Sequence, residues 1–145
     1  MNLTLDDIRS DITRAVKIAL EEDIGSGDIT AELIPEDKTD TATIITREDC
    51  TVCGTEWVNE TFKQLGGLDK IEWHVEDGDR AQANDTLVTL EGNTRRLLTG
   101  ERTALNFLQL LSGTATTARQ YADALPADSK IKLLDTRKTI PGLRT

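Results

Sequence analysis

The chain has 145 residues, of which 37% are hydrophobic and 30% charged, and its formal net charge is −9. This length can bury the core of one domain, and the few Pro and Gly residues argue against collagen-like and low-complexity classes. No apolar run approaches the roughly 18 residues that a membrane-spanning helix needs. The segment 1–7 lacks the basic and apolar regions of a secretory signal, so we expect a cytoplasmic protein with no membrane partner.

The charges are unevenly distributed along the chain. Residues 1–92 hold 22 Asp and Glu against 8 Lys and Arg, a balance of −14, whereas residues 93–145 hold 4 against 9, a balance of +5. A protein this acidic repels nucleic acids, so we expect no nucleic-acid partner. The cations of the last third fit a local site for a small, highly charged anion, and solvated Lys and Arg on a helix and a strand would give the same balance.

The first 54 residues predict one helix and the beginning of a β unit. Apolar residues recur at helical spacing over residues 5–20, where Thr4 fits the N-cap and Gly25 the end of the helix. Residues 41–47 are rich in Thr and Ile and predict a strand. We expect residues 50–54 to pair with that strand.

Residues 57–92 predict a short helix and two further strands. The apolar spacing over residues 57–65 fits a helix that closes at Gly66 and Gly67. Residues 71–75 and 86–92 alternate between apolar and polar side chains, as half-buried strands do. The sequence therefore predicts a β-rich unit with one inserted helix.

Cys50 and Cys53 form a C-x-x-C pair, which occurs in redox motifs and in zinc sites. Residues three apart in a strand point to opposite faces, and only His74 could add another soft ligand. We therefore interpret both cysteines as ordinary sheet residues and expect no metal site in this chain.

From Thr94 the pattern becomes a long amphipathic helix. Its predicted apolar face holds seven side chains: Leu97, Leu98, Ala104, Leu105, Leu108, Leu111 and Ala115. A polar row borders that face and consists of Arg95, Arg102, Asn106, Gln109 and Gly113. Such a row can line a cleft or form the solvated flank of the helix, and the sequence leaves both interpretations open. Glu101 falls within the apolar face, so we expect it to have an ion-pair or hydrogen-bond partner.

The last segment predicts a strand that ends in cations. Residues 130–135 alternate as a strand following a helix, the pattern that begins a parallel α/β layer. In α/β barrels the carboxyl ends of the strands carry the chemistry, so Arg137 and Lys138 are candidates for binding an anion.

Three motifs together resemble nicotinate-nucleotide pyrophosphorylase, the carboxylating quinolinate phosphoribosyltransferase family. They are EDIGSGDIT at residues 22–30, GERTALNFLQLLSG at 100–113 and LDTRKTIPGLR at 134–144. The resemblance implies an α+β fold, in which an N-terminal α/β sandwich of hammerhead-like shape occupies residues 1–113. A long helix would then lead into the first strand of a C-terminal α/β barrel that begins at residues 114–145. Members of the family run to about twice this length, so most of the barrel would be missing here.

The resemblance also implies an activity in NAD biosynthesis. Quinolinate reacts with phosphoribosyl pyrophosphate to give nicotinate mononucleotide, pyrophosphate and carbon dioxide, and Mg²⁺ accompanies the pyrophosphate substrate. Arg102 matches an arginine that reaches the partner subunit's active site and binds quinolinate, which implies a homodimer. Thr136, Arg137 and Lys138 match residues that bind substrate anions. Neither the magnesium ligands nor any catalytic residue matches a position in this chain, so the 145 residues alone are expected to be inactive.

Two other interpretations remain open. The paralogous family associated with molybdenum transport resembles the same fold, although the motifs at residues 100–109 and 135–144 favour quinolinate. Alternatively, residues 1–113 could serve as a non-catalytic binding or dimerisation module. A domain that normally packs against a barrel should expose a large apolar surface when the barrel is absent, whereas a self-sufficient module should not.

Overall fold

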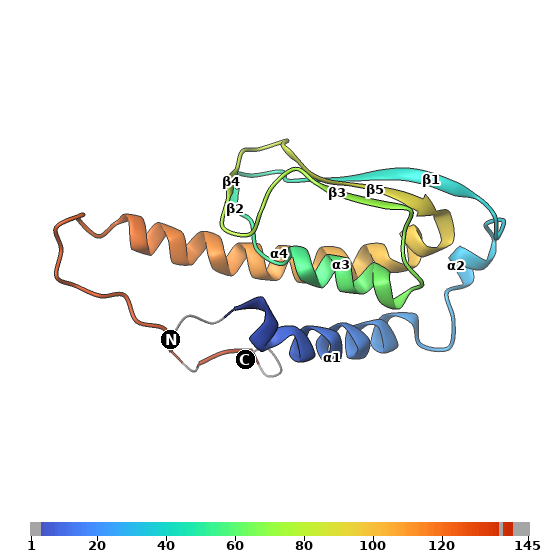
Figure 1. Cartoon of the computed structure of the whole chain (residues 1–145), viewed down its shortest axis with the longest axis horizontal. Helices are drawn as coiled ribbons and strands as arrows, with labels where there is room; N and C mark the ends of the chain where they lie inside the picture. The colour runs from blue at the N-terminus through green and yellow to red at the C-terminus, as the bar shows by residue number, and fades with distance from the viewer. Residues whose placement is uncertain (1–3, 137, 141–145) are drawn as a thin grey trace.

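The computed structural model describes residues 4–136 and 138–140 and has an α+β fold, as the sequence predicts. The elements follow one another as α1 (Leu5–Ile24), α2 (Ile29–Glu32), β1 (Thr39–Ile45), β2 (Cys50–Thr51), α3 (Thr55–Gln64), β3 (Lys70–Trp73), β4 (Arg80–Ala81), β5 (Thr86–Asn93) and α4 (Thr94–Asp123). Figure 1 shows three layers, in which the main sheet covers one side of α3 and α4 while α1 lies along the other side.

The main sheet has β5 at its centre and β1 and β3 at its edges, and both pairings are antiparallel. Val88 of β5 lies opposite Ile44 of β1 on one side and Trp73 of β3 on the other. β5 is the most deeply buried strand because it is paired along both edges and one face packs against the helices. The strands expected near residues 41–47, 71–75 and 86–92 are thus confirmed.

The predicted pairing of residues 50–54 with the first strand is wrong. β2 pairs instead with β4, so that Cys50 lies opposite Ala81 and Thr51 opposite Arg80. The turn before β2 is attached to the segment that leads into β5, because Asp49 accepts a hydrogen bond of 2.8 Å from the backbone N–H of Ala83. Local alternation identifies a strand, but contacts such as this one between distant residues select its partner.

The main core lies between the sheet and the α3/α4 layer. Phe62 of α3 is fully buried there with Val88 of β5 and with Ala104 and Leu108 of α4. A Cβ atom at Gly100 would lie 2.5 Å from Phe62 Cε1, so glycine is what allows α3 and α4 to approach so closely. The predicted apolar face of α4 is only partly buried, since Leu98 is 40% exposed.

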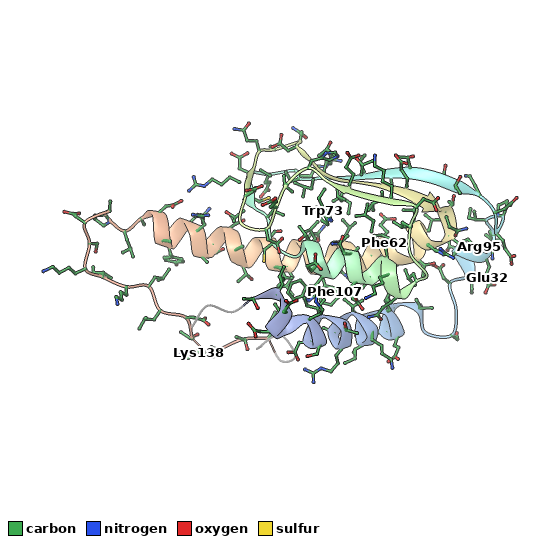
Figure 2. The ribbon with its side chains drawn as sticks, viewed as in Figure 1. Glu32, Phe62, Trp73, Arg95, Phe107 and Lys138 are labelled. Carbon is green, nitrogen blue, oxygen red and sulfur yellow. The ribbon has the colours of Figure 1, made fainter. Side chains whose placement is uncertain are left out.

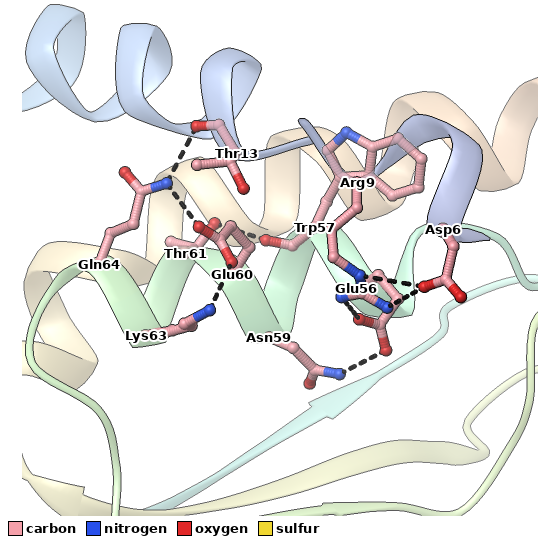
Figure 3. A network of polar contacts seen from close by, with 10 residues as sticks. All are labelled: Asp6, Arg9, Thr13, Glu56, Trp57, Asn59, Glu60, Thr61, Lys63 and Gln64. Atoms are coloured by element: carbon pink, nitrogen blue, oxygen red, sulfur yellow. Dashed lines mark hydrogen bonds and ion pairs between the residues drawn. The ribbon is translucent and has the colours of Figure 1, made fainter. Parts of the chain in front are cut away.

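A smaller cluster attaches α1 to the other helices. Ile12, Val16 and Leu20 of α1 are buried against Trp57 of α3 and Phe107 of α4. Polar contacts surround this cluster, as Figure 3 shows for the α1–α3 interface. Gln64 donates a hydrogen bond of 3.0 Å to the carbonyl of Thr13, and Arg9 forms an ion pair of 3.6 Å with Glu56. The position of α1 is thus fixed by a small core and by several solvent-accessible contacts.

The strand predicted at residues 130–135 is not formed. This segment belongs to an extended tail that leaves the end of α4 and returns toward α1 (Figure 1). A strand requires a hydrogen-bonded neighbour, and no strand among the described residues pairs with this segment. Three of its apolar side chains, Ile131, Leu133 and Leu134, are exposed as a result.

None of the helices in the described parts of the chain combines the length and apolar character that a membrane crossing requires.

Candidate anion-binding site

The candidate site is built around Arg102, in the first third of α4. Asn93 caps the start of this helix by accepting a hydrogen bond from the backbone N–H of Arg96 at 3.2 Å. The buried residues Ala104 and Leu108 fix the rotation of the helix, which turns Arg102 toward solvent. The Arg102 side chain is 76% exposed, and its Nη1 atom donates to Oδ1 of Asp23 on α1 at 3.1 Å. The guanidinium group therefore lies at the junction of α1 and α4.

An open depression of about 360 Å³ adjoins this ion pair. Its walls come from the C-terminal part of α1 and from the middle of α4, and they consist of Ala19, Glu22, Asp23, Arg102, Thr103, Asn106, Phe107 and Leu110. A guanidinium group presents up to five N–H donors in a planar fork that matches a carboxylate or a phosphate. The depression can therefore admit a small anion to Arg102 from the solvent.

A second carboxylate secures the loop between α1 and α2 beside this site. Asp28 caps α2 by accepting a hydrogen bond of 3.0 Å from the backbone N–H of Ala31. It also accepts one of 2.8 Å from the hydroxyl of Thr99, one turn before Arg102 on α4. These two hydrogen bonds, to Ala31 first and to Thr99 second, lower the pKa of Asp28 from its ordinary value, and the charge of Arg102 adds a smaller effect.

The polar row predicted on α4 divides into two parts. Asn106, Gln109 and Gly113 are exposed like Arg102, and together they border shallow grooves along this helix. Arg95 departs from the row and is structural, because it donates to the carbonyl of Ile34 at 2.6 Å. The C-terminal part of the row thus borders open grooves, while its first member fastens α4 to the segment after α2.

The prediction for Glu101 is wrong. Its side chain is exposed, and no hydrogen bond or ion pair engages it within residues 4–136 and 138–140. Glu101 lines a groove together with Leu98 and Leu105, on a part of the predicted apolar face of α4 that no described element covers. A carboxylate needs a partner only when it is buried, so its exposure removes that requirement.

Two other arginines make contacts that stabilise the fold. Arg96 donates from Nη1 to the carbonyls of Gly66 and Gly67, both at 2.9 Å, and so anchors the turn after α3. Arg119 donates to the carbonyl of Gly78 at 3.3 Å. Neither faces the depression beside Arg102.

The other predicted site residues lie on the extended tail. Thr136 and Lys138 are exposed, and their contacts are local: Thr136 N–H donates to Asp135 at 2.6 Å, and Lys138 N–H donates to Thr136 Oγ1 at 3.3 Å. In Figure 2, Lys138 lies on the left side of the view, whereas Arg95 and Glu32 lie at its right-hand end. Arg137 lies outside the described residues. No contact in the described parts of the chain joins Thr136 or Lys138 to Arg102.

The described residues contain no group of three or more His, Cys, Asp or Glu side chains arranged to hold a metal ion. Magnesium therefore finds no ligand set of that kind in this part of the protein. Cys50 and Cys53 are free and half-buried. Burial, and to a smaller extent the negative charge of Asp77, raise the pKa of the Cys53 thiol, which makes it a weaker nucleophile at neutral pH.

Asp23 and Asp28 are not among the predicted site residues, although both lie in the motif at residues 22–30. The available signal was the run Glu21, Glu22 and Asp23 at the end of α1, where the helix dipole disfavours negative charge. The distance of 79 residues between Asp23 and Arg102 hides their contact from any local pattern.

Comparison with known proteins gives the family. Residues 28–112 match the family model for the quinolinate phosphoribosyl transferase N-terminal domain. The mitochondrial, decarboxylating quinolinate phosphoribosyltransferase 2b of Nicotiana tabacum is 37% identical over 137 residues, which are 92% of this chain and 38% of the relative. The probable carboxylating nicotinate-nucleotide pyrophosphorylase of Bacillus subtilis is 38% identical over 123 residues, which are 85% of this chain and 42% of the relative.

Solved structures agree with this result. The nicotinate-nucleotide pyrophosphorylase from Francisella tularensis superposes with a TM-score of 0.87 at 45% identity, over 97% of this chain and 49% of that chain. The enzyme from Ehrlichia chaffeensis gives a TM-score of 0.84 at 38% identity, over 99% of this chain and 50% of that chain. The likeness confirms the predicted N-terminal fold, and the chain spans half or less of the length of these four proteins. The chain belongs to the quinolinate phosphoribosyltransferase family, whose N-terminal domain it contains.

Proposed function

We propose that this chain is the N-terminal part of a quinolinate phosphoribosyltransferase. The complete protein would transfer the phosphoribosyl group of phosphoribosyl pyrophosphate to the nitrogen of quinolinate and release pyrophosphate and carbon dioxide. The product would be nicotinate mononucleotide, a precursor of NAD. The observation that carries the proposal is the family match over residues 28–112, which includes Arg102 as an exposed guanidinium group beside an open depression.

Arg102 would bind a carboxylate of quinolinate through charge-assisted hydrogen bonds. In the proposed homodimer it would reach the active site of the partner subunit, which the exposure of its side chain at the junction of α1 and α4 would permit. Thr136, Arg137 and Lys138 would bind substrate anions once the remainder of a barrel orders their segment. All of these roles are electrostatic, since they hold polyanionic reactants together and offset the charge of the departing pyrophosphate.

The magnesium ion would enter with phosphoribosyl pyrophosphate and neutralise part of its charge. The chain offers no side-chain cluster for it among the described residues, and we expect its protein ligands to lie in the barrel. No catalytic residue is assigned within residues 1–145, so this chain alone should not turn over substrate. We further propose residues 1–113 as the first domain and 114–145 as the beginning of the barrel, although α4 runs unbroken through that boundary.

The names of the relatives support quinolinate over a role associated with molybdenum transport, since all four refer to quinolinate phosphoribosyltransferase or nicotinate-nucleotide pyrophosphorylase. The exposed apolar side chains of α4 and of the tail support a part of a larger enzyme over a self-sufficient binding module. The two free cysteines fit the reducing environment of a cytoplasmic location, which we also propose.

The test is an assay of the natural protein that contains these residues, with quinolinate, phosphoribosyl pyrophosphate and Mg²⁺. Formation of nicotinate mononucleotide together with equimolar carbon dioxide would support the proposal. Parallel reactions with nicotinate in place of quinolinate provide the matched control, because nicotinate lacks the carboxylate that is lost. If the protein forms no product from quinolinate, the proposed activity is wrong.

A further inference from the structure

The C-terminal end of α1 is unusual for a helix terminus. Its last turn contains Glu21, Glu22 and Asp23 and no basic residue. Helix dipoles place partial negative charge at this end, so three carboxylates there oppose helix stability. Residues that violate a local rule of this kind are frequently retained for function.

Asp23 differs from its two acidic neighbours in burial and in contacts. Its side chain is 22% exposed, and it accepts a hydrogen bond from Arg102 Nη1 at 3.1 Å. The Glu21 side chain lies 3.9 Å from the ammonium group of Lys17 on its own helix. Glu22 lines the same depression as Asp23, but no ion pair in the described residues engages it. Asp23 is therefore the one of these three acidic residues whose carboxylate contacts Arg102.

The geometry of this ion pair leaves most of Arg102 available. Only Nη1 has a partner among the described residues. The Nε and Nη2 atoms carry three further N–H groups, and two of them, Nε–H and one Nη2–H, lie parallel on the other edge of the guanidinium plane. That edge is the one that can bind a carboxylate through two parallel hydrogen bonds. Asp23 can thus hold the guanidinium group while an anion binds to it.

We propose that Asp23 is a positioning residue for Arg102. This inference rests on the proposed role of Arg102 in binding quinolinate. Asp23 orders the flexible arginine side chain before the anion arrives, so that less conformational entropy is lost on binding. The small core and polar contacts that fix α1 on α3 and α4 in turn fix Asp23, and α1 thereby contributes to the site through Arg102.

A positioning role and a simple charge effect of Asp23 predict opposite changes in quinolinate binding, so the two can be tested against each other. If Asp23 acted only through its charge, its removal would favour an anionic substrate, as would removal of Glu22 from the same depression. Positioning predicts that Asp23→Ala weakens quinolinate binding while Glu22→Ala slightly strengthens it. These two variants remove similar charges from adjacent positions, and only Asp23 contacts Arg102.

The experiment measures kcat and KM for quinolinate in the natural protein carrying Asp23→Ala, Asp23→Asn, Glu22→Ala or Arg102→Ala, and in the Asp23→Ala/Arg102→Ala double variant. We expect Asp23→Ala to raise KM about three- to tenfold with kcat nearly unchanged. The reason is that the Arg102 side chain is no longer ordered before the anion binds, so more conformational entropy is lost on binding. Asp23→Asn keeps an acceptor for Arg102 and should raise KM less. In the Arg102→Ala background, Asp23→Ala should have no further effect.

The outcomes separate the inference from the proposed function. If Arg102→Ala leaves KM and kcat at wild-type values, the proposed function of Arg102 fails, whatever Asp23 does. If Arg102→Ala impairs binding but Asp23→Ala lowers KM or leaves it unchanged, the positioning role is overturned and the proposed function stands. Thermal melting identifies misfolded variants, and the milder Asp23→Asn decides the question if Asp23→Ala does not fold.

Discussion

Thr99 donates a hydrogen bond of 2.8 Å to Asp28 and so ties the loop after α1 to the first third of α4. The same carboxylate caps α2 through the backbone N–H of Ala31. Asp28 thereby fixes the segment that follows Asp23, one helical turn from Arg102. Asp28 thus stabilises the fold beside the site, whereas Asp23 contacts the candidate binding residue Arg102.

The first prediction concerns the stability that Asp28 provides. Replacing Asp28 with Ala should cost about 1 kcal/mol of unfolding free energy, since it removes a helix cap and the bond from Thr99. Urea denaturation of the chain measures this cost. Asp37→Ala is the matched control, because Asp37 is an exposed carboxylate nearby in the sequence. Equal urea midpoints for Asp28→Ala and Asp37→Ala would contradict the structural role of Asp28.

The second prediction follows from the lowered pKa of Asp28. A carboxyl group whose pKa is lower in the folded state stabilises the fold fully above its unfolded pKa, and this stabilisation is lost as the pH falls through the folded value. The ordinary pKa of Asp28 is 3.8. Wild-type protein should therefore lose stability relative to Asp28→Asn on acidification below about pH 4. A constant difference between the two proteins from pH 7 to pH 3 would contradict this expectation.

The third prediction compares two glycines on α4. Gly100→Ala should destabilise the chain by about 1 to 3 kcal/mol, because its Cβ atom would lie 2.5 Å from Phe62 Cε1. Gly113→Ala should instead stabilise the chain by up to about 1 kcal/mol, since nothing lies within 4 Å of its Cβ position and alanine favours the helix. Urea denaturation of both variants checks the two signs, and a stable Gly100→Ala protein would show that the helices are packed less closely than described.

The fourth prediction concerns self-association of the 145-residue chain. Exposed apolar residues lie on α4 and on the tail, and they include Leu98, Leu110, Tyr121, Leu133 and Leu134. We expect concentration-dependent association in sedimentation experiments, because these side chains form unprotected apolar surface. Replacing Leu133 and Leu134 with Ser should reduce it, whereas Ile18→Ser, at an exposed position on α1, should have little effect. A strictly monomeric chain at high concentration would contradict this prediction.

The elements that the sequence predicts well are those with local signals. The helix near residues 5–20 has its cap at Thr4, whose backbone N–H donates to Asp7 at 2.9 Å, and it ends before Gly25. The pairing of Cys50 with Ala81 was missed because partner choice depends on contacts across the chain. Similarly, whether Glu101 is buried or exposed depends on which elements cover α4, and helical spacing does not reveal this.

The sequence predicts one residue of the candidate site, Arg102, but not the contact that Arg102 makes. Arg102 was found because it stands in a long, distinctive motif and on the polar side of a helix. Its ion pair with Asp23 joins two different helices that are far apart in the sequence, so it appears only once the fold is known. The strand at residues 130–135 was expected from alternation alone, yet alternation cannot supply the neighbouring strand that a sheet requires.

The most direct test of the account is the effect of Arg102→Ala on kcat/KM for quinolinate in the natural protein. We expect a loss of about 30- to 1000-fold, equivalent to about 2 to 4 kcal/mol, because a charged contact to a bound anion is removed. Arg119→Ala serves as the control, since Arg119 donates to the Gly78 carbonyl and does not line the depression beside Arg102, and it should retain wild-type kcat/KM. Wild-type kcat/KM in a folded Arg102→Ala protein would contradict the central claim that Arg102 binds the substrate.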